Sequence, residues 1–154
     1  MDNNLLDYGV TGFWMVDQDE PPKVARTDVT AAMRAVALSV GWQVLETRWA
    51  EHTSFHETRM AGDDQRLSIL FNISYPLVAF SEPTKTGDMH IDFKDHQPLA
   101  QAVLHATKFR PLAIAELMRP LQQADLSGLN EAEHQQIDYW QPATIGEVIF
   151  NFWD

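Results

Sequence analysis

Apolar and polar side chains alternate along the middle of the chain with the period of two that is typical of β-strands. In residues 67–75, five apolar side chains alternate with Ser68, Leu70, Asn72 and Ser74. Because successive side chains of a strand point to opposite faces, this pattern predicts a strand with one buried face. Further strands are predicted at residues 10–16, 42–50, 55–61, 77–80 and 89–94. The turn at residues 62–64 and the other short connections indicate antiparallel neighbours.

Helical spacing is found before residue 42 and after residue 97. One helix face is formed by Val29, Met33, Val36 and Val40. Thr27 or Asp28 can cap this helix at its start, and Gly41 suits the left-handed residue after its end. Pro98 and Pro111 are expected to open two more helices, because proline is favoured in a first helical turn.

Two capping boxes mark further helices near the end of the chain. Asn130 pairs with Glu133 and Thr144 with Glu147 at the spacing of this motif, and an apolar stripe from Ile145 to Phe152 follows the second pair. Strands followed by helices, without βαβ alternation, predict the α+β class. We expect one domain, residues 1–154, with an antiparallel sheet of about four to six strands packed against an N-terminal helix and several C-terminal helices.

The excess of acidic residues is confined to the two ends of the chain. The sequence has 22 acidic and 11 basic residues, a net charge of −11. Residues 1–22 contain five acids and residues 120–154 contain six, with no Lys or Arg in either segment. A chain without a basic stripe is not expected to bind nucleic acid or an anionic membrane. Since chain termini often lie close together, the two acidic segments are predicted to meet on one side of the domain.

Other function classes are disfavoured by what the sequence lacks. It has no cysteine, which excludes disulfides, thiolate metal sites and cysteine nucleophiles. Its acidic start does not match a secretory signal, and no apolar run reaches the roughly 20 residues of a membrane span. These features predict a cytoplasmic protein.

The histidines are the first candidates for metal or acid–base chemistry. His52 and His56 have i, i+4 spacing beside Glu51 and Glu57, but not the order of a zincin helix, and they bridge two predicted strands. His90, with Asp92, falls on the solvated face of a short strand. We therefore predict no metal site. The sequence also lacks a nucleophile elbow, an S-x-x-K motif and a phosphate-binding glycine loop, so we predict no cofactor and no enzyme activity.

Five tryptophans are divided between the core and the acidic ends. Trp42 and Trp49 flank a predicted strand and are expected to pack in the core. Trp14 and Trp140 lie in or beside the acidic segments. They are candidate interface anchors, since Trp dominates many binding hot spots.

The last fifteen residues, WQPATIGEVIFNFWD, resemble the ends of small bacterial proteins. In size, acidity and predicted α+β layout the chain is similar to immunity proteins of bacterial toxin–immunity systems, including contact-dependent growth inhibition. This resemblance implies a cytoplasmic inhibitor that binds one cognate toxin, often a basic nuclease. An acidic surface would steer onto such a partner electrostatically. The residues predicted to bind the partner are Asp17, Asp19, Glu20, Asp63, Asp64, Glu131, Glu133, Trp14 and Trp140.

Two alternatives remain open from the sequence. A dimeric secretion-chaperone-like or adaptor module would also be small, acidic and α+β, and it would bind its target through apolar grooves. A small metal-dependent enzyme would use His52, His56 and His90. The sequence does not determine the oligomeric state.

Overall fold

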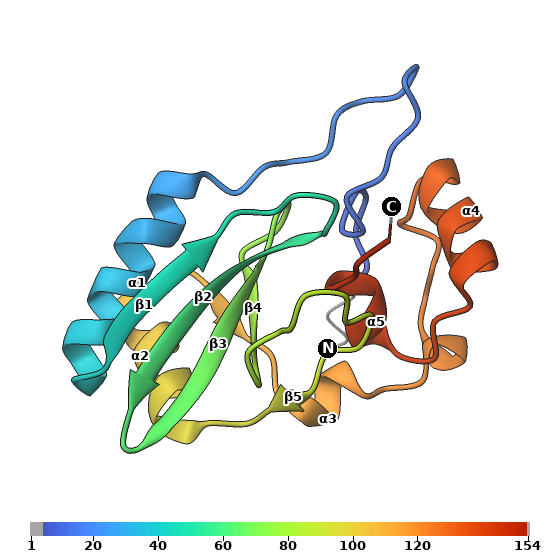
Figure 1. Ribbon diagram of the computed structural model, residues 1–154. Helices are drawn as coiled ribbons and strands as arrows, with labels where there is room; N and C mark the ends of the chain where they lie inside the picture. Colours follow the sequence, from blue (N-terminus) through green and yellow to red (C-terminus); the bar gives the residue numbers. More distant parts are fainter. Residues whose placement is uncertain (1–4, 154) are drawn as a thin grey trace.

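The computed structural model describes residues 5–153 and has the α+β architecture that the sequence predicts (Figure 1). The helix α1 (Arg26–Val40) precedes the strands β1 (Gln43–Arg48), β2 (Phe55–Gly62), β3 (Gln65–Asn72), β4 (Leu77–Ser81) and β5 (Phe93–Lys94). They are followed by α2 (Gln97–Ala106), β6 (Arg110–Pro111), α3 (Ile114–Leu117), the 3-10 turn η1 (Leu121–Gln123), α4 (Glu131–Trp140) and α5 (Ile145–Ile149).

The sheet follows the order of the strands along the chain. Strands β1 to β5 are antiparallel neighbours in the order β1-β2-β3-β4-β5, and the two-residue β6 pairs with β4 in parallel. The longest pairing joins β2 to β3 through a two-residue turn, in which Asp63 and Asp64 have φ of 50° and 60°. Asp and Asn tolerate this left-handed conformation better than most residues, which explains the predicted turn at residues 62–64.

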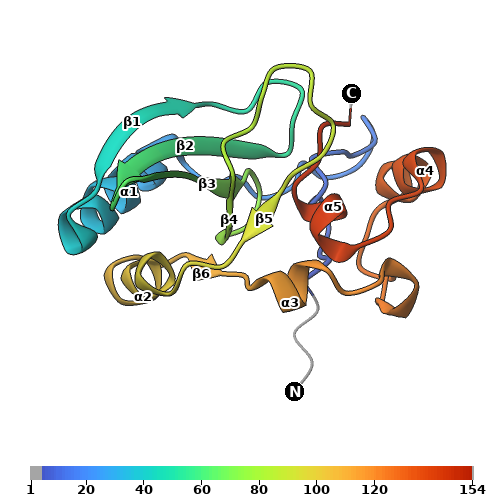
Figure 2. The same ribbon diagram turned by 60° about the horizontal axis from the view of Figure 1, so that its bottom comes forward.

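The two faces of the sheet carry separate apolar cores. Leu67, Ile69 and Phe71 of β3 pack toward α1 and α2. Leu70, on the opposite face, packs with residues of the N-terminal segment and of α3 to α5. Figure 2 shows α1 and α2 together at one end of the molecule and α3, α4 and α5 at the other. Because both faces are covered, Ser68 and Asn72 of β3 are also buried, and the prediction of a single buried face is wrong.

Three predicted elements differ in the structure. Residues 10–16 form turns and irregular backbone and no strand, because Gly9 and Gly12 have positive φ and the backbone between them bonds to side chains far along the chain. Pro111 lies in β6, where its lack of an N–H costs no ladder bond, and the helix after it shrinks to α3 and η1. Only residues 93–94 of the predicted strand at 89–94 pair with β4.

The helix ends were predicted with mixed success. Gly41 ends α1 with φ of 72°, as expected, but the N-cap is Ala25 and makes no side-chain cap bond. The capping box of Asn130 and Glu133 is complete. That of Thr144 is half formed, since its hydroxyl accepts the N–H of Glu147 while the Glu147 carboxylate accepts the N–H of Ala143.

A buried charged group holds the loop after β4 against the sheet. The Glu57 carboxylate accepts hydrogen bonds from the hydroxyls of Ser68 and Thr84, both at 2.5 Å, and lies 3.4 Å from the guanidinium of Arg59. Burial alone would raise the pKa of Glu57. The hydrogen bonds from Ser68 and Thr84, with the charge of Arg59, outweigh burial and lower the pKa.

His56 is buried on the opposite face of β2. Its Nδ1 accepts the N–H of Ala50 at 2.9 Å, and its ring meets the edge of Trp49 at 5.0 Å. Burial, followed by the nearby charge of Arg26, lowers the pKa of His56 to about 4. The folded protein therefore holds this imidazole neutral at pH 6, where the unfolded chain binds a proton more readily.

We expect the free energy of unfolding to fall as the pH drops from about 6.5 toward 4, with His56 contributing about 2–3 kcal/mol of the loss. The sign follows because the unfolded state binds more protons in this window. Urea unfolding at pH 7, 6, 5 and 4.5 should show a weaker pH dependence for His56→Gln than for the wild type. His105→Gln, at an exposed histidine, should keep the wild-type dependence. Parallel curves for the wild type and His56→Gln would contradict a neutral buried His56.

Candidate functional site

The two acidic segments of the chain pack directly against each other. Backbone carbonyls of residues 10–13 accept hydrogen bonds from three buried amide side chains. Asn72 donates to Val10, Asn151 to Thr11 and Asn130 to Phe13, at 2.9, 3.2 and 2.8 Å. The N-terminal segment therefore lies between the end of β3 and the C-terminal helices. The predicted contact between the two ends of the chain is confirmed for the described residues.

Glu133 lies at the centre of this contact. Its Oε1 accepts the N–H groups of Gly9 and Asn130 at 2.7 and 3.1 Å, and its Oε2 accepts the N–H and hydroxyl of Thr11 at 2.9 and 2.6 Å. The side chain is fully buried. The prediction that Glu133 contacts a partner is therefore wrong, because a carboxylate surrounded by these donors is committed to the fold.

The other acids of the two segments that fall within residues 5–153 are exposed. They are Asp7, Asp17, Asp19 and Glu20 in the N-terminal segment, and Asp125, Glu131, Asp138 and Glu147 in the C-terminal one. We call this set the acidic end. Lys23, just beyond the N-terminal segment, is paired with Glu20 at 2.9 Å. In Figure 1 the N-terminal loop projects at the top, on the same side of the molecule as α4.

Asp63 and Asp64 do not belong to the acidic end. They form the β2–β3 turn, which lies at the other end of the hairpin from Asn72, and Asp63 accepts the indole N–H of Trp42 at 3.1 Å. Figure 1 shows this turn at the lower left, away from α4. Both side chains are exposed, but we place them outside the proposed surface.

The two segments of the acidic end also expose large apolar and aromatic side chains. Trp14, predicted as an anchor, is 41% exposed, and Val16 in the same loop is fully exposed. On α4, Tyr139 is 78% exposed. Tyr139 was not among the predicted anchors, although its place two residues after the buried Ile137 turns it away from the core side of the helix.

Trp140, the other predicted anchor, packs against the C-terminal segment of the chain. Its ring stacks on Trp153 with centroids 6.4 Å apart and planes 3° from parallel, and its Nε1 donates to Gln136 at 2.9 Å. Trp42 is buried, as predicted, and Trp49 packs against the core that lies toward α1 and α2.

The loop that carries Asp17 and Asp19 is closed at its base. The hydroxyl of Tyr8 donates to the carbonyl of Asp19 at 2.7 Å. Gly9 has φ of 84°, and a Cβ on it would lie 2.2 Å from the Cβ of Pro21. This contact leaves no room for a side chain at residue 9. The exposed part of the loop is therefore held on a rigid base.

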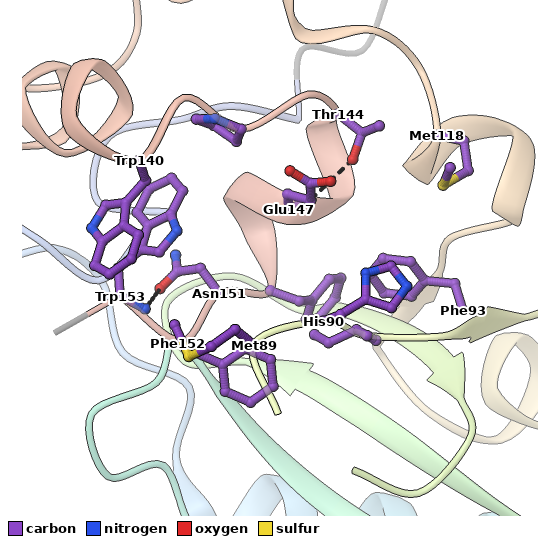
Figure 3. A pocket seen from close by; sticks show the side chains of 13 residues that line it. Met89, His90, Phe93, Met118, Trp140, Thr144, Glu147, Asn151, Phe152 and Trp153 are labelled. Carbon is purple, nitrogen blue, oxygen red and sulfur yellow. Dashed lines mark hydrogen bonds between the residues drawn. The ribbon is translucent and has the colours of Figure 1, made fainter. Parts of the chain in front are cut away.

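A pocket of about 300 Å³ lies beside the acidic end, between the loop before β5 and the C-terminal segment (Figure 3). Trp140, Phe152 and Trp153 form part of its wall, with Asn151 between them and α5. The amide of Asn151 is engaged, since it donates to Thr11 and Val148 and accepts the N–H of Trp153. The remaining polar side chains are Glu147, Thr144 and His90.

The histidines do not converge. His56 is buried in the sheet, His52 is exposed in the loop between β1 and β2, and His90 lies at the pocket. Within residues 5–153 the structure contains no group of three His, Cys, Asp or Glu side chains placed to hold a metal ion. No helix in this part of the chain has the length and hydropathy to cross a membrane.

Comparison of the chain with protein-family models, with curated proteins and with solved structures finds no match. Its function must therefore be inferred from the geometry and charge of the chain itself.

Replacing Glu133 by Gln should lower the free energy of unfolding by about 2–4 kcal/mol, because the amide places a donor against the N–H groups that the carboxylate accepts. Urea unfolding followed by circular dichroism measures this loss. The matched control is Glu131→Gln, at an exposed acid of the same helix turn, which should change stability by less than about 0.5 kcal/mol. Equal stability of the two variants would contradict the assigned role of Glu133.

Gly9→Ala should destabilise the protein by more than about 2 kcal/mol, since the new Cβ adds a clash with Pro21 to the cost of a positive φ. Gly87→Ala is the control, because Gly87 has φ of 88° and a Cβ there would meet nothing within 4 Å. It should cost only the backbone strain, about 1–2 kcal/mol. Thermal unfolding of both variants separates the clash from the backbone strain, and equal losses would show that the Gly9–Pro21 contact is unimportant.

Proposed function

We propose that this chain is a non-enzymatic immunity protein that acts in the cytoplasm and neutralises a basic protein toxin by binding it through the acidic end. The observation that carries the proposal is the packing of two acidic segments, neither of which contains Lys or Arg, against each other. Each of these segments also exposes an aromatic side chain, Trp14 in the N-terminal loop and Tyr139 on α4. The small size, the net charge of −11 and the α+β fold of the chain fit the same class.

The charge arrangement suits recognition of a basic surface. A nuclease needs Lys and Arg where it grips phosphates. Exposed carboxylates at the acidic end would attract that surface over several ångströms and raise the association rate. An acidic protein bound there would also keep the nucleic acid away, which is the simplest route to inhibition.

The exposed aromatic side chains would contribute most of the binding free energy that the charged groups cannot supply. Exposed charge pairs contribute little each, typically below about 1 kcal/mol, because water and salt screen them. Tyr and Trp bury large areas at small entropic cost and dominate binding hot spots. Trp14 is held by the closed N-terminal loop and Tyr139 by α4, so neither needs much ordering on binding.

The partner can be sought in the gene directly upstream, where an exported protein with a basic C-terminal domain is expected. Co-expression of that domain with this chain should relieve its toxicity and yield a one-to-one complex on co-purification. Failure to bind the domain, with both proteins folded, would argue against the immunity function.

Asp17→Asn with Asp19→Asn should lower the association rate constant by about 3- to 10-fold at low salt and change dissociation much less. The double variant should also bind with a weaker dependence on ionic strength, as measured by stopped flow from 20 to 500 mM salt. The control removes the same charge at the other end of the sheet, with Asp64→Asn and Glu82→Gln, both at exposed positions.

The control should bind at the wild-type rate. Equal slowing by the two double variants would show a general charge effect and no localised surface. Association that is indifferent to salt would favour the adaptor alternative, in which apolar contacts dominate.

A further inference from the structure

The side chains that line the pocket beside the acidic end include a negative charge and no Lys or Arg. Among its lining residues Glu147 is the only carboxylate, His90 is the only group with a basic nitrogen, and Lys and Arg are absent. Residues 120–153, which supply most of the wall, contain no Lys or Arg at all. A cationic guest therefore meets no fixed positive charge here, whereas an anionic guest would face Glu147.

One oxygen of the Glu147 carboxylate is hydrogen-bonded within the chain, and the other is available to a ligand. Its Oε2 accepts the N–H of Ala143 at 2.9 Å, which orients the group at the start of α5. The other oxygen, Oε1, has no hydrogen-bond partner among the described residues, and the side chain is exposed. A donor on a guest can reach this oxygen without displacing an internal bond.

The remaining wall suits a guest that is flat and partly apolar. Figure 3 shows the stacked rings of Trp140 and Trp153 on one side of the pocket and His90 with Phe93 on the other. Two methionines, Met89 and Met118, are 59% and 53% exposed at the pocket. Methionine side chains adapt their shape to a guest and are favoured at binding surfaces.

We infer that this pocket receives the side chain of an arginine presented by a protein partner. The guanidinium is planar, always charged and weakly hydrated, so it can pack on an aromatic ring while it donates to a carboxylate. Its three-carbon stem would contact the methionines. A lysine could use the charge of Glu147 but not the flat aromatic surface, and an apolar side chain would leave the free oxygen of Glu147 without a donor.

The choice of a protein as the source of the arginine rests on the proposed function, since the pocket adjoins the acidic end through α4 and α5. The preference of the pocket for a guanidinium group does not depend on the proposed function. It can be measured without any partner, so the pocket proposal and the immunity proposal can fail separately.

The test uses N-acetyl-arginine methylamide as the probe, titrated into the full chain and followed by ¹H–¹⁵N NMR. We expect the indole N–H signals of Trp140 and Trp153 and the backbone signals of residues 143–147 to shift along one binding curve. N-acetyl-citrulline methylamide has the same shape without the charge, and it should bind about tenfold more weakly.

Glu147→Gln should remove this preference, because the amide can still accept the N–H of Ala143 but carries no charge. Glu131→Gln, at an exposed acid on α4 that does not line the pocket, is the control and should leave the preference intact. The inference is overturned if the arginine probe shifts none of these signals, if citrulline binds equally well, or if both variants behave alike. In any of those cases the salt dependence of partner binding still tests the acidic end by itself.

Discussion

The Glu133 carboxylate joins the two ends of the chain, and the placement of the surface acids depends on that junction. It accepts two hydrogen bonds on each oxygen, from donors at residues 9 and 11 and from Asn130, the N-cap of its own helix. A buried charge is costly unless such donors surround it. Detaching the N-terminal segment would therefore remove donors from the Glu133 carboxylate and destabilise the fold. The fold of residues 9–13 and the start of α4 are thus one structural unit.

This junction brings together segments that would otherwise repel. Both ends of the chain are acidic and lack bases, and charges of one sign held close together destabilise a compact state. The cost is limited because eight of the carboxylates are exposed to water, where exposed pairs interact weakly. Solvation of these groups permits the arrangement, while Glu133 and the amides of Asn72, Asn130 and Asn151 enforce it. An acidic surface that is maintained despite repulsion between its carboxylates is consistent with a role in binding a basic partner.

Elements governed by local interactions could be predicted from the sequence. The face of α1, the β2–β3 turn and the Asn130 capping box depend on residues within a few positions of one another, and all three are present. Residues 10–16 could not be predicted, because their backbone bonds to side chains more than 60 positions away. Glu133 shows both cases in one side chain. Its bond to Asn130 is local and was predicted, while its bonds to residues 9 and 11 are not visible in any pattern of spacing.

The neighbouring residues Tyr139 and Trp140 show why the candidate site also needed the structure. Both are aromatic and end the same helix, so composition alone cannot distinguish them. Because successive helical residues point about 100° apart, only one of the two can face the C-terminal segment. Trp140 does so and stacks on Trp153 in the pocket wall, and Tyr139 is left exposed next to Asp138 in the sequence. An exposed aromatic side chain and an aromatic-walled pocket therefore lie at the same end of α4. A partner that used both would have to be aligned with this helix, which gives the surface a means of discrimination that charge alone does not provide.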